Sequence, residues 1–305
     1  MFRAILVPLD GSPMAEQGLA TAARLARATG SALHLVHVHV AASPDPISIE
    51  GMPVIDEGLH SLAAEHERVY LERAAATVAG ESLAPIITRL EGPVVQTLTS
   101  FARDIQSGLI VMTTHGRSGF AHLWLGSVAE ALVRVSGTPL LLLRPDAEGV
   151  VAARPFQRVL VPLDGSPLAE EILPHAATLA GLDGGTVTAL RIVDTLLAPA
   201  SMPFHERFHM DEATLARERA QAELYLQGVA ANLAPTPVQA MVQVAEQPAR
   251  AILETSTAIG ADLIAVTTHG RSAATRIPLS SVTDKVLRGA AQPLLIVRPG
   301  MHHVD

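Results

Sequence analysis

The sequence predicts an α/β fold that occurs twice: two tandem copies of an open five-stranded parallel sheet with helices on both faces. The 305 residues are the length of two ordinary domains, since one compact domain usually spans ~100–200 residues. Short apolar runs alternate with helix-like segments, which is the pattern of parallel strands joined by helical crossovers. The second half of the chain also repeats the first.

The internal repeat has one constant offset of 154 residues. Three pairs of segments share it: residues 5–26 with 159–180, 109–118 with 263–272, and 139–145 with 293–299. In the first pair, 15 of 22 positions are identical. This period is too long for a solenoid repeat, so we predict duplication of a whole domain. We place the two domains at residues 1–146 and 155–305, on either side of a short irregular segment.

The first elements can be justified from individual residues. Ala4–Leu9 is a nearly continuous apolar run, as expected of a buried parallel strand. An Asp-Gly pair then favours a turn. Ser12 is placed to cap a helix over Met14–Thr29, with proline in its first turn, and Gly30 is expected to end that helix.

The remaining elements follow from the same apolar periodicity. In the first copy we expect strands at 32–40, 85–90, 109–113 and 139–143, and helices at about 59–79, 94–106 and 126–135. In the second copy we expect strands at 158–163, 186–193, 238–244, 263–267 and 293–297, and helices at 167–180, 212–232, 248–259 and 281–289.

Composition and charge argue against several classes of function. The net charge is −8 and Lys285 is the only lysine, so the chain lacks the clustered cations that a nucleic-acid surface or a polybasic membrane anchor needs. The absence of cysteine excludes disulfides and thiolate nucleophiles. No apolar run approaches the ~20 residues that span a bilayer, and the first residues do not resemble a signal peptide. We expect a cytoplasmic protein that binds neither nucleic acid nor membrane.

Ligands of open α/β sheets bind beyond the carboxyl ends of the strands. The first strand–helix turn lies there, and it contains Asp10. The sequence leaves two interpretations of the Asp10 carboxylate open. Either it closes an Asx turn, or it faces ribose hydroxyls or a metal ion.

The loop after the fourth strand of the first copy has phosphate-binding chemistry. Gly116 allows the backbone to approach an anion closely, and Arg117 can add positive charge. Gly126 and Ser127 open a helix whose free N–H groups favour phosphate. The same pair is also compatible with plain helix capping. Neither a P-loop nor a dinucleotide fingerprint is present.

Three segments together resemble the universal stress protein family. They are PLDGSP at 8–13, THGRSG at 114–119 and the Gly126–Ser127 pair, and the resemblance covers nearly the whole chain twice. It implies a Rossmann-like, adenine nucleotide alpha hydrolase-like fold. Similar family members bind ATP through the motif G-x2-G-x9-G-[ST], whose first position is Thr113 here. The resemblance implies adenosine contacts from Pro8, Leu9 and Asp10, adenine contacts from the backbone of Val38, and phosphate contacts from Gly116, Gly126, Ser127 and Val128.

The second copy departs from this motif. Asp164 and its turn are intact, and Thr267 and Gly270 match. Ser280 stands where the first copy has Gly126, and Ser281 follows it. The Cβ of Ser280 lies where close backbone approach is needed, so we predict that ATP binds the first domain more tightly.

Histidines at 34, 37 and 39 follow one expected strand, and His37 and His39 share a face. Such a pair belongs either to a metal site, for which no third ligand is evident, or to the hydrogen bonding of the strand.

The resemblance implies a nucleotide-binding regulator of the stress response that holds ATP, with Mg²⁺ as a candidate companion, and acts on an unknown protein partner. The alternatives are a slow ATPase and an interaction scaffold that has lost its nucleotide. No set of catalytic residues is visible. The last strand of each copy is apolar, and the resemblance places it at a sheet edge, which favours pairing. We expect an intramolecular pseudo-dimer of the two halves, and a homodimer of the chain is a further alternative.

Overall fold

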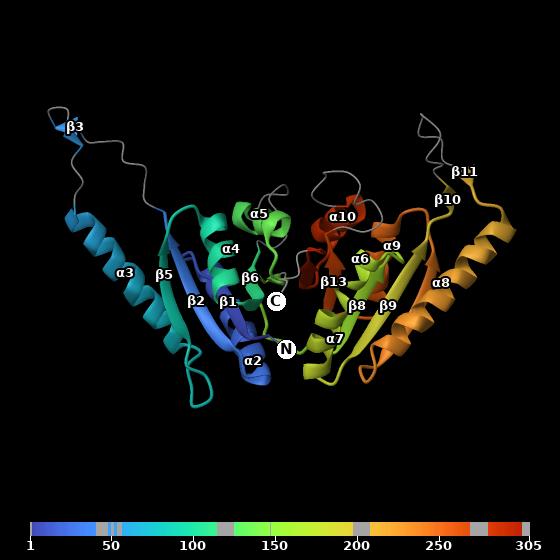
Figure 1. Cartoon of the computed structure of the whole chain (residues 1–305), viewed down its shortest axis with the longest axis horizontal. Helices are drawn as coiled ribbons and strands as arrows, with labels where there is room; N and C mark the ends of the chain where they lie inside the picture. The colour runs from blue at the N-terminus through green and yellow to red at the C-terminus, as the bar shows by residue number, and fades with distance from the viewer. Residues whose placement is uncertain are drawn as a thin grey trace. The chain divides into compact units, whose positions relative to one another are not determined.

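The computed structural model describes residues 2–40, 48–49, 52–53, 57–114, 125–146, 148–197, 208–268 and 280–300. These residues form two compact units, Met1–Ala153 and Arg154–Asp305 (Figure 1). Each unit is described here by itself.

The sheet of the first unit has five parallel strands in the order β7-β6-β1-β2-β5. Their bounds are β1 Ala4–Pro8, β2 Ala32–His39, β5 Ile86–Glu91, β6 Ser107–Thr113 and β7 Leu140–Leu143. The helices are α1 Pro13–Glu16, α2 Leu19–Thr29, α3 Glu57–Ala76, α4 Val94–Asp104 and α5 Ser127–Val135. A short antiparallel pair, β3 Ser48–Ile49 with β4 Met52–Pro53, precedes α3.

The second unit has the same order, β14-β13-β8-β9-β12, and its strands are again parallel. Their bounds are β8 Arg158–Leu163, β9 Thr186–Val193, β12 Val238–Val244, β13 Leu263–Thr267 and β14 Leu294–Val297. The helices are α6 Pro167–Glu170, α7 Leu173–Leu182, α8 Glu212–Asn232, α9 Pro248–Ala258 and α10 Ser281–Gly289. The pair β10 Leu196–Leu197 and β11 Phe208–His209 precedes α8. The predicted fold is thus confirmed in both units.

Helices cover both faces of each sheet. Successive residues of a strand point to opposite faces, and all four residues of β7, like Ala4–Val7 of β1, are buried. In the first unit α2 and α3 contact β1, β2 and β5, whereas α4 packs against α5 and the same sheet. This double cover explains why the strands are continuous apolar runs.

One predicted helix is wrong in both copies. The expected helix Met14–Thr29 is divided into α1 and α2 at Gln17 and Gly18. The side-chain amide of Gln17 donates to the carbonyl oxygen of Gly149 at 3.0 Å and accepts from the backbone N–H of Val151 at 2.6 Å. Contacts with a segment more than 130 residues away therefore form at the break.

The expected helix 167–180 is divided in the same place, between Glu170 and Leu173. Here Pro174 lies in the first turn of α7. Proline has no N–H to donate to the preceding turn, which favours the division here, although the first copy is divided at the same place with Ala20 at the equivalent position.

The local capping signals are confirmed. The Ser12 hydroxyl accepts from the N–H of Ala15 at 3.2 Å. Gly30 ends α2 with φ of 67°, a left-handed conformation that favours glycine. Among the described helices, none is both long enough and apolar enough to cross a bilayer.

Candidate functional site

The turn after β1 lies at the carboxyl end of the central strand. Oδ1 of Asp10 accepts from the N–H of Ser12 at 2.9 Å, and Gly11 has φ of 88°. The Asx-turn interpretation is therefore confirmed. This turn uses one carboxylate oxygen of Asp10, so it is compatible with a ligand role for the other. Leu9 is buried and donates its N–H to the carbonyl oxygen of Val36 at 2.8 Å.

The start of α5 differs from the start of α10 in its capping. Gly126 is the N-cap of α5, with φ of −58° and ψ of 154°, and supplies no side-chain hydrogen bond. Ser280 is the N-cap of α10, and its hydroxyl oxygen accepts from the N–H of Thr283 at 3.0 Å. The same hydroxyl donates to Oγ1 of Thr283 at 2.8 Å. The first turn of α5 therefore offers N–H groups to an anion, and the first turn of α10 has already used one.

The structure brings many of the predicted positions together in the second unit, around a cavity of about 550 Å³. The residues lining it include Pro162, Leu163, Asp164, Ile192, Thr267, Ser281 and Val282. In the first copy the equivalent positions are Pro8, Leu9, Asp10, Val38, Thr113, Ser127 and Val128. The turn after the first strand, the end of the second strand and the start of the last helix thus line one cavity in the second unit.

Thr113 has a structural role in addition to its place in the motif. Its hydroxyl donates to the carbonyl oxygen of Met14 at 2.6 Å, which attaches the end of β6 to α1. Gly116, Arg117 and Gly270 lie outside the described residues.

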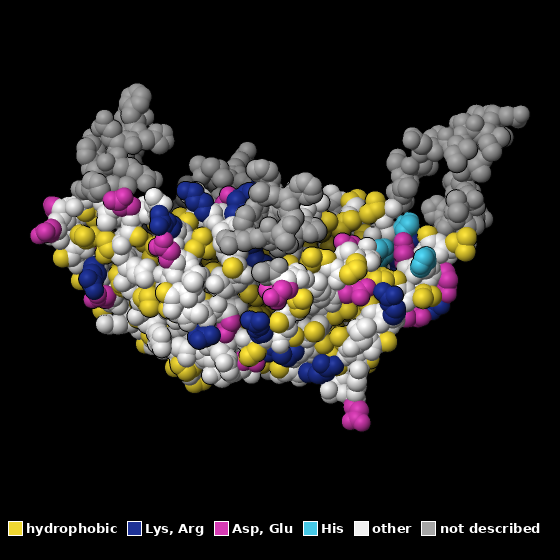
Figure 2. All heavy atoms as spheres, turned by 180° about the vertical axis from the view of Figure 1, so that it is seen from behind, with side chains coloured by type: hydrophobic (Ala, Val, Ile, Leu, Met, Phe, Trp, Pro, Cys, Tyr) yellow, Lys and Arg dark blue, Asp and Glu magenta, His cyan; other side chains and the backbone are white. Residues whose placement is uncertain are grey.

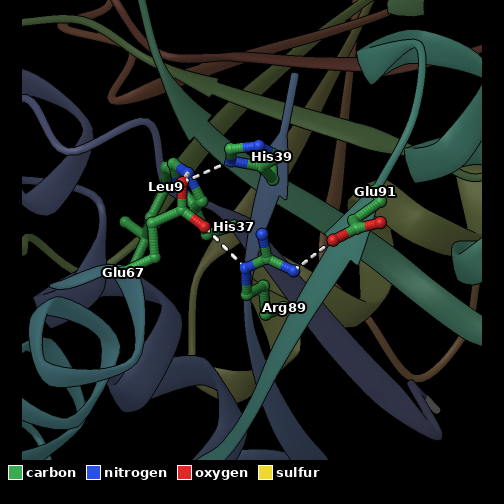
Figure 3. Close-up of polar contacts among 6 residues, drawn as sticks. All are labelled: Leu9, His37, His39, Glu67, Arg89 and Glu91. Carbon is green, nitrogen blue, oxygen red and sulfur yellow. Dashed lines mark hydrogen bonds and ion pairs between the residues drawn. The ribbon is translucent and has the colours of Figure 1, made fainter. Parts of the chain in front are cut away.

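Sequence reasoning missed an ionic network beside the first-unit site, drawn in Figure 3. Nδ1 of His37 lies 2.8 Å from the carbonyl oxygen of Leu9. Because a carbonyl only accepts, Nδ1 carries the proton, and His37 attaches β2 to the turn after β1.

The centre of this network is Glu67 on α3. Its carboxylate accepts from Nδ1 of His39 and from Nε of Arg89, each at 2.6 Å, and lies 3.5 Å from Nε2 of His37. Arg89 also pairs with Glu91 at 2.6 Å. Burial favours the neutral acid, but the hydrogen bonds from His39 and Arg89 outweigh it and hold the pKa of Glu67 below its usual range.

His37 and His39 both have hydrogen-bonding partners on other elements. Among the described residues, no three acidic or histidine side chains are arranged to hold a metal ion. Figure 2 shows histidine side chains beside acidic ones at the surface of the first unit. No signal in the sequence pairs Glu67 with the strand, because α3 follows β2 after a variable segment.

The only two tyrosines of the chain, Tyr70 on α3 and Tyr225 on α8, occupy equivalent positions near the two Asp turns. Both hydroxyl oxygens are buried and make no hydrogen bond of ordinary geometry with the described residues, although Glu16 lies close to the first and Glu170 to the second. Burial, with nearby Glu16, raises the pKa of Tyr70 to about 12. Burial, with Glu170 close by, also raises the pKa of Tyr225. They lie 155 residues apart, one more than the offset of the three matched segment pairs, and this near-equivalence in the repeat is the signal that could have identified them.

The sequence profile of the universal stress protein family matches residues 1–144 and 155–298. The chain belongs to this family. It is 28% identical over 302 residues to a universal stress protein of Mycolicibacterium smegmatis, covering 97% of each chain. It is 26% identical over 316 residues to a universal stress protein of Mycobacterium tuberculosis, covering 96% of this chain and 94% of the relative. The crystal structure of a universal stress protein from Archaeoglobus fulgidus has the same fold, with a TM-score of 0.71 at 20% identity and coverage of 98% and 99%.

The two domains of this universal stress protein differ beside the site. Arg191 replaces His37, and its guanidinium donates to the carbonyl oxygen of Leu163 at 3.4 Å. The link from the second strand to the first turn is therefore kept. The other members of the network are absent, because Val193 replaces His39 and Ala222 replaces Glu67.

Proposed function

We propose that this universal stress protein binds an adenine nucleotide, ATP in particular, in its first domain. The observation that carries the proposal is the start of α5, where Gly126 leaves the first N–H groups without a side-chain cap. Phosphate binds such helix ends because the N–H groups and the helix dipole both favour negative charge. Ser127, exposed at the same helix start, adds a hydroxyl donor.

The adenosine part would lie over the ends of β1 and β2. Leu9 and Val38 supply apolar surface there, and Asp10 has a carboxylate oxygen beyond the one used in its turn. That oxygen would accept from ribose hydroxyls or hold Mg²⁺, which would offset part of the phosphate charge. The grouping of the equivalent residues around one cavity in the second domain supports this arrangement.

We further propose that the nucleotide acts as a regulatory ligand in the stress response. A ligand that binds one conformation of a protein better than another shifts the population toward it. The surface of the favoured conformation would then be recognised by a protein partner.

The test is whether the purified full-length protein carries or takes up nucleotide. We expect mass spectrometry of the denatured protein to detect retained adenine nucleotide, and calorimetry with ATP to give saturable binding. Retention of none, together with no binding of ATP up to millimolar concentration, would contradict the proposal.

Ser127→Ala should weaken ATP binding by about 0.5–1.5 kcal/mol for a neutral hydrogen bond, and by up to about 3 kcal/mol if the hydroxyl meets a charged phosphate. The measurement is calorimetric titration of the full-length variant with ATP. Ser100→Ala, a serine on α4, is the matched control and should leave the ATP affinity unchanged. An unchanged affinity in Ser127→Ala would show that Ser127 does not contact phosphate.

A further inference from the structure

The cavity of the second domain has an apolar wall suited to a flat ring. Leu163, Leu190, Ile192 and Val266 line it from the strands, and Ile252 lines it from α9. Its volume of about 550 Å³ lies within the range of small-molecule sites.

The charges around this cavity disfavour a polyanion. Among the described residues, Asp164, Asp194 and Glu218 contribute carboxylates to its lining and Arg191 contributes a guanidinium. A triphosphate that reached them would meet like charge. Val40 and Ala63 stand in the first domain where the second has Asp194 and Glu218. Asp194 and Glu218 are therefore specific to the second domain, whereas the first domain has Glu67 at the lining position of Ala222.

The helix start in this cavity is also less open to phosphate. The Ser280 hydroxyl already accepts from the N–H of Thr283, and the Thr283 hydroxyl donates to the carbonyl oxygen of Thr267 at 3.0 Å. The N–H and the hydroxyl of Thr283 therefore both donate within the protein already, and neither is free to donate to a phosphate.

Tyr225 lines the cavity, and its buried hydroxyl makes no hydrogen bond of ordinary geometry with the described residues, although the carboxylate of Glu170 lies close to it. A buried polar group without a hydrogen bond is costly. A neutral ligand with its own hydroxyl groups would relieve this cost, and the carboxylate of Asp164 could accept from the same ligand.

We propose that the cavity of the second domain takes a purine nucleoside without a phosphate chain, and that Tyr225 is a contact for its sugar hydroxyls. The inference rests on the proposed function, since the choice of a nucleoside assumes that the equivalent positions of the first domain bind an adenine nucleotide. The two domains would then sense different forms of the same ligand class.

The two tyrosines make the test direct, because each domain holds one of them beside its site. The full-length protein is labelled with 13C in the tyrosine rings, and Tyr70→Phe and Tyr225→Phe assign the two ring signals. Adenosine, AMP and ATP are then titrated separately. We expect adenosine to shift the Tyr225 signal saturably, with AMP weaker and ATP weakest at that ring. ATP should shift the Tyr70 signal.

The outcomes separate this inference from the proposed function. If ATP moves Tyr70 while adenosine leaves Tyr225 unmoved, the inference is wrong and the proposed function stands. If ATP moves Tyr225 at lower concentration than adenosine does, the charge argument is wrong. If none of the three ligands moves either ring, both proposals fail.

Two sets of variants sharpen the result. Tyr225→Phe should weaken adenosine binding by about 3- to 10-fold, as expected for one lost neutral hydrogen bond. Tyr70→Phe is its matched control and should not change adenosine binding at Tyr225.

Asp194→Val with Glu218→Ala gives the second domain the residues of the first, and should strengthen ATP binding there by about 10-fold. Unchanged ATP binding in that variant would overturn the role of the carboxylates.

Discussion

Gly126→Val should remove most of the ATP affinity of the full-length protein, by about 100-fold or more, which corresponds to about 2.7 kcal/mol. Gly126 has φ of −58° and ψ of 154°, which is extended backbone that valine adopts without strain. Gly126 supplies no side-chain cap to α5, so the helix loses no hydrogen bond. The isopropyl group would occupy the space next to the first N–H groups, where phosphate is expected to approach. Calorimetry with ATP measures the loss.

The matched control is Gly80→Val in the same domain. A Cβ at Gly80 meets nothing within 4 Å, and its φ is not left-handed. This variant should bind ATP as the unsubstituted protein does. Full ATP affinity in Gly126→Val, in a protein whose circular dichroism is unchanged, would show that phosphate does not approach α5.

Glu67→Ala should lower the free energy of unfolding of the first domain by about 2–4 kcal/mol. The substitution removes the carboxylate that accepts from His39 and Arg89, and it leaves a half-buried guanidinium with only Glu91 as its partner among the described residues. Leaving charged groups unpaired away from water costs several kcal/mol. Alanine is compatible with the helix, since Ala222 occupies the equivalent position. Urea unfolding gives the loss, and hydrogen exchange of the β2 and β5 amides assigns it to the first domain.

Glu65→Ala is the control, because Glu65 also pairs with an arginine, Arg68, but both side chains are more than half exposed. Exposed pairs contribute little, so we expect the free energy of unfolding to stay nearly unchanged. The pKa of Glu67 is lower in the folded state than its usual value, so its stabilisation is present above the unfolded pKa and is lost as pH falls through the folded one. The difference between Glu67→Ala and the unsubstituted protein should therefore shrink below about pH 4. A difference that stays constant down to pH 3 would contradict the ionic account.

The fold could be predicted because its signals are local or repeated. Continuous apolar runs marked the buried strands, Ser12 and Gly30 marked the ends of helices, and the offset of 154 residues transferred each assignment to the other copy. These features act within a few residues of the chain, so their physical effect is the same wherever the segment is finally packed.

Part of the candidate site was also within reach of the sequence. The positions of Asp164 and Ser281 follow a strand end and a helix start, and parallel strands bring such ends to one edge of a sheet. The cavity in the second domain joins these positions. The difference in capping between α5 and α10 could be predicted only in part. The sequence shows that Ser280 replaces Gly126, but it does not show that the Ser280 hydroxyl accepts from the N–H of Thr283.

Only the tertiary structure decided which distant side chains meet. Gln17 contacts a segment more than 130 residues later, and Glu67 meets Arg89 and His39 from three different elements. The burial of the Tyr225 hydroxyl is likewise a result of packing. Sequence alone determined the five main strands of each copy and most of the helices between them, because those depend on short-range periodicity. The charges and hydrogen bonds that distinguish the two domains depend on long-range contacts between elements, and no local pattern encodes them.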